Sequence, residues 1–211
     1  MSSNDIIGLL EIIGFFIVWF GVGIGISFPF TALIKKFPKL FKILNLPITL
    51  YPYGYMISIA VMLIFDSEDA GIIPFIVFLV LHPLVWAALI ANFRAMKAVE
   101  PKSIATLNMV NKLVQIPAYI FHFIVGLFGA ALSIWGIGFF LFAIIIDIIS
   151  IVISGTFSLA ATIELYKQKK ITLALAIFAA IASYIYCIDV VAVIIVKVIA
   201  SKADKEKSLS L

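Results

Sequence analysis

A few ionisable side chains lie inside the long apolar runs of this sequence, where a charge is costly. They are Glu11, His82, His122, Asp147 and Asp189. A charged side chain at the centre of a bilayer costs at least about 2.5 kcal/mol, so it is retained where it faces protein or water. Carboxylates in such positions can bind a cation or relay a proton. Glu11, Asp147 and Asp189 are therefore the first candidates for a path through the protein.

A polar stripe follows residues 108–133, where side chains recur at steps of three and four and so share one helix face. Its members are Asn108, Asn111, Lys112, Gln115, Tyr119, His122, Gly126, Gly129 and Ser133. Pro117 would free the carbonyl of Leu113, which predicts a kink and a hinge. Two interpretations stay open. The stripe either lines a water-accessible path through Gln115, Tyr119 and His122, or forms a packing seam between helices.

A second stripe carries a carboxylate and three hydroxyls at helical spacing, namely Asp147, Ser150, Ser154 and Ser158. Such a face can coordinate a cation through oxygen or relay a proton. Asp189 lies one turn after Tyr186, which predicts a hydrogen bond between phenol and carboxylate. We expect Asp189 to lock its helix to a neighbour or to take part in the path.

Small residues and prolines indicate how the helices pack. Glycines on the first run (Gly14, Gly21, Gly25) and on the stripe (Gly126, Gly129) predict close helix crossings. A crossing at Gly14 would carry Glu11 inward, although its long side chain can also reach interfacial water. Pro83 follows His82 and is a second predicted hinge. His122 is the better candidate for titration, because an unperturbed imidazole has a pKa of about 6.5.

Composition decides the class of fold. Hydrophobic residues make up 64% of the 211 residues and charged residues 12%, with a mean hydropathy of +1.25. A soluble domain carries roughly twice that charged fraction, so the surplus apolar surface must face lipid. Six runs are long enough to span a bilayer: 6–28, 48–65, 72–93, 114–134, 137–161 and 171–196. We predict an all-α polytopic bundle in one domain, residues 1–200, with a polar, disordered tail at 201–211.

The basic residues predict the orientation, because short loops rich in Lys and Arg stay in the cytoplasm. The loop clusters are Lys35, Lys36, Lys39 and Lys42; Arg94, Lys97, Lys102 and Lys112; and Lys167, Lys169 and Lys170. Six crossings then place both termini outside the cell membrane, including a tail that carries Lys197 and Lys202. A re-entrant segment around 184–189 would leave five crossings and return the tail to the cytoplasm.

The first basic loop predicts a short interfacial helix over 38–45, with Lys39 and Lys42 among bulky apolar residues. Lys35 and Lys36 anchor the same interface. Tyr51 and Tyr53 follow at the level expected for an aromatic belt.

Several function classes lack their sequence signals. There is no phosphate-binding Gly-rich loop, no nucleophile elbow and no zinc-protease helix, so we do not predict an enzyme. The single cysteine, Cys187, has no partner for a thiolate metal site. The His and carboxylate spacings predict no metal, and nothing predicts another cofactor. The basic clusters fit membrane topology and not nucleic-acid binding.

The stretch from Asn108 to Tyr119, NMVNKLVQIPAY, resembles a pattern found in uncharacterised multi-pass proteins of low-GC Gram-positive bacteria. The resemblance covers one helix entrance and implies a membrane location and no known activity. Our leading hypothesis is a small transporter or channel-like permease for an ion or small solute. The alternative is a non-catalytic scaffold, accessory subunit or immunity-type protein. Its partners would be the lipid bilayer and another membrane protein or a second copy of this chain.

Overall fold

The computed structural model describes residues 3–64 and 72–209, except for the side chains of residues 3–13, 16, 59–60, 62–63, 73–75, 78 and 204–209. All regular elements in these residues are helices, which confirms the all-α prediction. The α-helices are α1 (Ser3–Lys36), α2 (Phe41–Leu44), α3 (Leu46–Ile64), α4 (Ile72–Ala95), α5 (Pro101–Ala131), α6 (Ile137–Lys167), α7 (Leu173–Ala182) and α8 (Ile188–Leu209).

Four stretches of the described helices are long and apolar enough to cross a membrane. They are Ile17–Lys36, Leu79–Ala98, Pro101–Ala131 and Ile137–Lys167. Large apolar side chains cover their outward faces, as at Ile17, Val18 and Phe128, each of which is more than half exposed. Contiguous apolar surface of this kind is typical of a protein that faces lipid.

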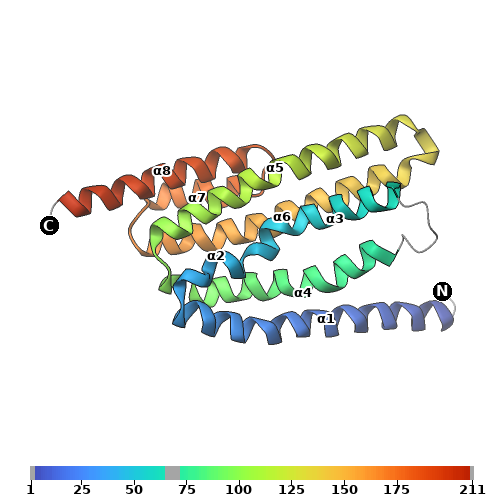
Figure 1. The fold of residues 1–211 in the computed structure, drawn as a ribbon, viewed down its shortest axis with the longest axis horizontal. Helices are drawn as coiled ribbons and strands as arrows, with labels where there is room; N and C mark the ends of the chain where they lie inside the picture. The colour runs from blue at the N-terminus through green and yellow to red at the C-terminus, as the bar shows by residue number, and fades with distance from the viewer. Residues whose placement is uncertain (1–2, 65–71, 210–211) are drawn as a thin grey trace.

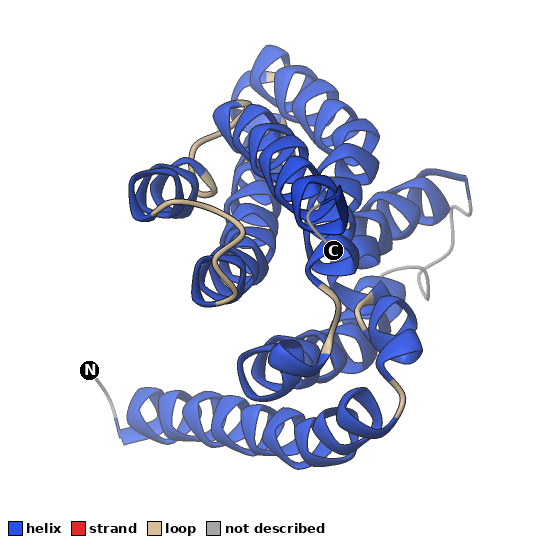
Figure 2. Cartoon of the chain, turned by 90° about the vertical axis from the view of Figure 1, so that its left-hand side faces the viewer, coloured by secondary structure: helices blue, strands red, loops and turns tan. Residues whose placement is uncertain are grey.

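The long helices run side by side along the long axis of the molecule (Figure 1). The basic ends of α1, α4 and α6 lie together at one end, and we call it the basic end. α5 packs along α6 and also contacts α3 and α8, whereas α1 packs chiefly on α4. α1 therefore forms one edge of the molecule, beginning at the marked N-terminus in Figure 2. The buried polar and charged side chains described below lie mainly on α3, α5, α6, α7 and α8.

The glycine contacts of α1 differ from the prediction. A Cβ built at Gly14, Gly21 or Gly25 meets no atom of the described residues within 4 Å. The close contact with α4 is at Gly23, where a Cβ would lie 3.0 Å from Trp86 Cβ and 3.2 Å from the Pro83 carbonyl oxygen. Residues two apart point in nearly opposite directions on a helix, so Gly21 and Gly25 face away from α4.

The predicted sixth helix, 171–196, is broken in two. α7 ends at Ala182, the chain turns over Ser183 to Cys187, and α8 starts at Ile188 and returns to the basic end (Figure 1). Cys187 has the left-handed φ of 64° at this reversal. The tip of the hairpin rests on α6 at Gly155, where a Cβ would lie 2.8 Å from the Tyr184 ring. The absent side chain at Gly155 is what lets the tip approach.

α8 is longer than expected and runs to Leu209. The disorder predicted for the tail is therefore not observed over residues 201–209. Alanine, lysine and glutamate are strong helix formers, and they dominate this stretch. The polarity of this stretch therefore did not indicate that its backbone is helical.

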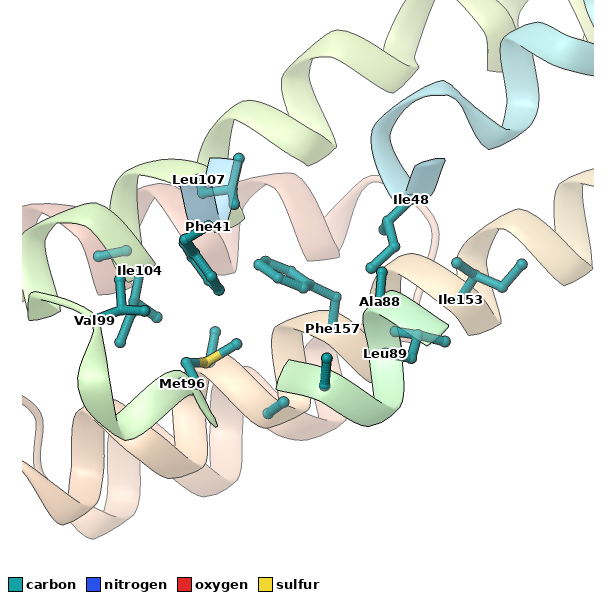
Figure 3. Packing of buried hydrophobic residues seen from close by; sticks show 14 of the residues in the cluster. Phe41, Ile48, Ala88, Leu89, Met96, Val99, Ile104, Leu107, Ile153 and Phe157 are labelled. Carbon is teal, nitrogen blue, oxygen red and sulfur yellow. The ribbon is translucent and has the colours of Figure 1, made fainter. Parts of the chain in front are cut away.

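The first basic loop is helical, with a short 3-10 turn over Pro38–Leu40 that leads into α2. Phe41 is buried and its ring packs against that of Phe157, while Met96 lies close by in the same core (Figure 3). Lys35, Lys36, Lys39 and Lys42 are all exposed at this end. Tyr51 is fully buried in the core and contacts His82, so it does not belong to an exposed aromatic belt. Tyr53 is partly buried.

Replacement of Gly155 by Leu should displace the hairpin tip, because the new side chain would overlap Tyr184 and the Ser183 carbonyl. Overpacking of this kind costs about 1–3 kcal/mol, so the Tm of the purified protein in detergent should fall. Gly138→Leu on the same helix is the matched control, since a Cβ there meets nothing within 4 Å. Equal Tm values for the two variants would contradict the close approach at Gly155.

Candidate functional site

The two polar stripes predicted from the sequence face one another along α5 and α6. His122 Nδ1 lies 2.8 Å from Asp147 Oδ1. Closer to the basic end, Lys112 Nζ donates to Ser154 Oγ at 2.8 Å. Nearest the basic end, Ser158 Oγ donates to Asn108 Oδ1 at 2.6 Å. We call these facing rows the α5–α6 seam.

Lys112 is the most deeply enclosed charge in the described residues. Its side chain is fully buried, and Nζ lies 2.8 Å from Asp189 Oδ2 on α8. It also donates to Ser154 Oγ and, at 3.2 Å, to the Ser183 carbonyl oxygen. The sequence predicted Lys112 both in the second basic loop and in the polar stripe; the loop assignment is wrong, because the residue lies inside α5 and is buried. Its place in the stripe with Gln115 and Tyr119 was the signal that could have found it.

The ion pair joins the two half-helices at the break. Ser183 is the C-cap of α7, so Lys112 places a positive charge at the negative end of that helix. Asp189 lies in the first turn of α8 and accepts from the Val190 backbone N–H at 2.8 Å. A carboxylate there neutralises the positive end of α8. Lys112 and Asp189 thus neutralise each other and both helix ends.

The second charged pair, His122 and Asp147, lies toward the far end of the seam. The His122 ring is fully buried and the Asp147 side chain is 19% exposed. With Nδ1 bonded to the carboxylate, Nε2 of His122 has no partner among the described residues. In a neutral imidazole with this geometry the Nδ1–H donates to the carboxylate, and Nε2 is left as an acceptor.

Two tyrosines lie between the charged pairs. The rings of Tyr119 and Tyr186 are 5.7 Å apart in an edge-to-face arrangement. Tyr119 Oη donates to Gln115 Oε1 at 3.1 Å. Both phenols line one cavity with Asp189, and Tyr119 lies one turn before His122 on α5, so the phenols lie near both charged pairs.

Gln115 has a structural role that the sequence did not reveal. Pro52 in α3 lacks an N–H, so the carbonyl of Ile48 four residues earlier has no donor in its own helix. Gln115 Nε2 donates to that oxygen at 2.8 Å. In return, Tyr53 Oη donates to the Val114 carbonyl beside Pro117. These bonds satisfy backbone groups near two prolines and hold α3 against α5.

Several buried polar atoms of the seam have no hydrogen-bond partner among the described residues. They are Asn108 Nδ2, Asn111 Nδ2, His122 Nε2 and Ser150 Oγ, together with Thr162 Oγ1, which continues the α6 row one turn beyond Ser158. An unpaired polar group in apolar surroundings costs several kcal/mol, so such groups normally contact water or a ligand. Their occurrence along one seam marks it as the place where a polar species would be accommodated.

The remaining predicted site residues are spread more widely. Glu11 is one of the residues whose side chain the structure does not describe. Pro83 and Pro117 both lie inside helices that continue through them, α4 and α5. Gly126 and Gly129 lie at the α5–α6 crossing, where a Cβ would meet Ala143 Cβ at 3.4 Å and the Gly136 carbonyl at 2.7 Å. Among the described residues, no three His, Cys, Asp or Glu side chains form a group that could hold a metal ion.

Comparison of the chain with protein-family models, with curated proteins and with solved structures found no match.

Removing one member of the Lys112–Asp189 pair should be much worse than removing both. Lys112→Met or Asp189→Leu leaves a buried charge without a partner, which lowers the free energy of unfolding by about 3–5 kcal/mol. The double variant replaces the pair by apolar groups and should recover most of that loss. Chemical unfolding of the three variants in detergent measures this. Additive losses would show that the two charges do not interact.

Proposed function

We propose that this chain is an integral membrane permease that moves protons along the α5–α6 seam. The observation that carries the proposal is the His122–Asp147 pair, in which a buried imidazole is bonded to a partly exposed carboxylate and keeps its other nitrogen unpartnered. Both side chains are of types that carry protons in membrane proteins, and both lie in helices long enough to cross a bilayer.

The length and chemistry of the seam support this proposal. From Asp147 to Thr162 the seam follows about 22 Å of α6, at 1.5 Å per residue. Along it lie hydroxyl and amide groups that can bond to water, together with the Lys112 ammonium. A hydroxyl both donates and accepts, so it can pass a proton along a hydrogen-bonded chain. In this path Asp147 is the partly exposed entrance, and His122, Ser150 and Ser154 follow inward.

Some of the predicted path residues have other roles in this proposal. Gln115 holds α3 to α5, and its Oε1 accepts the hydrogen bond that fixes the Tyr119 phenol. Asp189 anchors the hairpin and holds Lys112 in the seam. Pro117 lies inside α5 beside these contacts, so a bend at this position would move Tyr119 and His122 together.

We further propose five crossings and a re-entrant hairpin. α7 has 10 residues and so a length of about 15 Å, half the hydrocarbon thickness, which puts the 183–187 turn near the membrane centre. α8 then returns to the basic end (Figure 1). This topology places every basic cluster and the C-terminal tail in the cytoplasm, with the N-terminus outside. It removes the conflict that six crossings create for Lys197 and Lys202.

Labelling of single cysteines in intact cells tests the topology. In a Cys187→Ser background, Trp135→Cys should react with a membrane-impermeant maleimide, because Trp135 is 90% exposed at the end of α5 opposite the basic end. Lys202→Cys should react only after the cells are permeabilised. Labelling of both positions from outside would instead support six crossings.

Proton flux into liposomes tests the function. Purified protein in vesicles that contain a pH-sensitive dye should admit protons when a potassium gradient with valinomycin makes the interior negative. Asp147→Asn keeps the shape of the side chain but removes its ability to ionise, so flux should fall by about tenfold or more.

Glu164→Gln is the matched control for this assay. It makes the same chemical change on the same helix, at a carboxylate bonded to Gln168 outside the seam, and flux should stay at the wild-type rate. Wild-type flux no greater than that of empty vesicles would refute the proposal. If Asp147→Asn instead reduced only the amount of inserted protein, the seam would be a packing device and the scaffold hypothesis would be favoured.

A further inference from the structure

A cavity of about 430 Å³ lies beside the helix break, between α5 and the start of α8. Its walls include the aliphatic side chains of Ile116, Ile120 and Val191. Its polar groups come from Tyr119, Tyr186 and Asp189. Ile120 and Val191 are more than half exposed on the outer surface of the helices, so the cavity can be reached from the side.

The charge and the aromatic rings of this cavity restrict what can bind. Asp189 is the single charged residue in its lining, and its side chain is 4% exposed. Its carboxylate accepts from Lys112 and from the Val190 N–H, and two oxygens offer about four acceptor positions, so acceptor capacity remains. The paired rings of Tyr119 and Tyr186 present π-systems in the same space, and such rings attract cations.

We propose that this cavity binds an organic cation with an apolar body. The body would occupy the aliphatic part, and the positive charge would lie between the Tyr119–Tyr186 pair and Asp189. A volume of this size fits a small organic molecule and exceeds what an inorganic ion needs. An anion would meet the Asp189 carboxylate, which lines the cavity whereas its partner Lys112 does not, so the anion would be repelled.

The site also lies where a transported molecule would be expected. Interrupted helices place half-helix ends and backbone groups at the membrane centre, and binding sites of transporters commonly form there. The binding site itself does not depend on proton flux. Only the step from binding of the cation to its transport rests on the proposed function.

Binding of tetraphenylphosphonium to the purified protein, measured by equilibrium dialysis, tests the site. Tetraphenylborate is the matched control, because it has the same shape and the opposite charge. We expect the cation to bind at least about tenfold more tightly than the anion, since the charge lies beside a desolvated carboxylate and two rings. Equal binding of the two ions would show that the cavity is merely apolar and would overturn the proposal.

Two tryptophan variants locate the binding without touching the ion pair. Ile120→Trp fills the cavity and should weaken tetraphenylphosphonium binding by about tenfold or more. Ile124→Trp, one turn along the same helix and similarly exposed, does not line the cavity and should bind as wild type does. Unchanged binding in Ile120→Trp would overturn the assignment of the site.

The charge requirement is tested in the Lys112→Met/Asp189→Leu double variant, which has no unpaired charge that could unfold it. Its preference for tetraphenylphosphonium over tetraphenylborate should fall to about a third or less. An undiminished preference would show that Asp189 does not attract the cation. The proton-flux assay contains no organic cation, so a negative result there and a negative result here are separate findings.

Discussion

The buried ion pair between Lys112 and Asp189 is the constraint on which the rest of the structure depends. It joins α5 to α8, and through Ser154 and the Ser183 carbonyl it also reaches α6 and the end of α7. A chain reversal in apolar surroundings leaves backbone groups and helix dipoles uncompensated unless other parts of the protein satisfy them. Lys112 and Asp189 meet this need at both helix ends, which is why the break between α7 and α8 can exist inside the bundle.

Once the hairpin is fixed, the polar groups divide into two kinds. The hydrogen bonds of Gln115 with Ile48 and of Ser158 with Asn108 join one helix to another and hold the bundle together. The His122–Asp147 pair is different, because one of its groups is partly exposed and the other keeps an unpartnered nitrogen inside. Packing alone would favour an apolar pair at this position, since buried charges rarely improve stability. This pair is the observation on which the proposed movement of protons rests.

The sequence predicted the helical class and the two facing stripes, because periodicity reports which side chains share a face. Hydropathy did not register the break at 183–187, since the run is mostly apolar on both sides of it. The basic tail did suggest it, as the alternative of a re-entrant segment around 184–189. The sequence also misplaced Lys112 and Tyr51. Both side chains are amphipathic and occur at membrane interfaces, so only their partners in space, Asp189 and His82, show that they are buried. Likewise, the hydrogen bonds exchanged by Asn45 and Asn92 join residues 47 positions apart.

Proton movement along the α5–α6 seam requires the seam to be hydrated, and water-edited solid-state NMR of the labelled protein in bilayers measures this. Magnetisation from water should reach the ring nitrogens of His122 and the Ser150 side chain quickly. Phe157, which is fully buried in the apolar core, provides the dry reference. Transfer to His122 as slow as transfer to Phe157 would show a sealed packing seam and contradict the account.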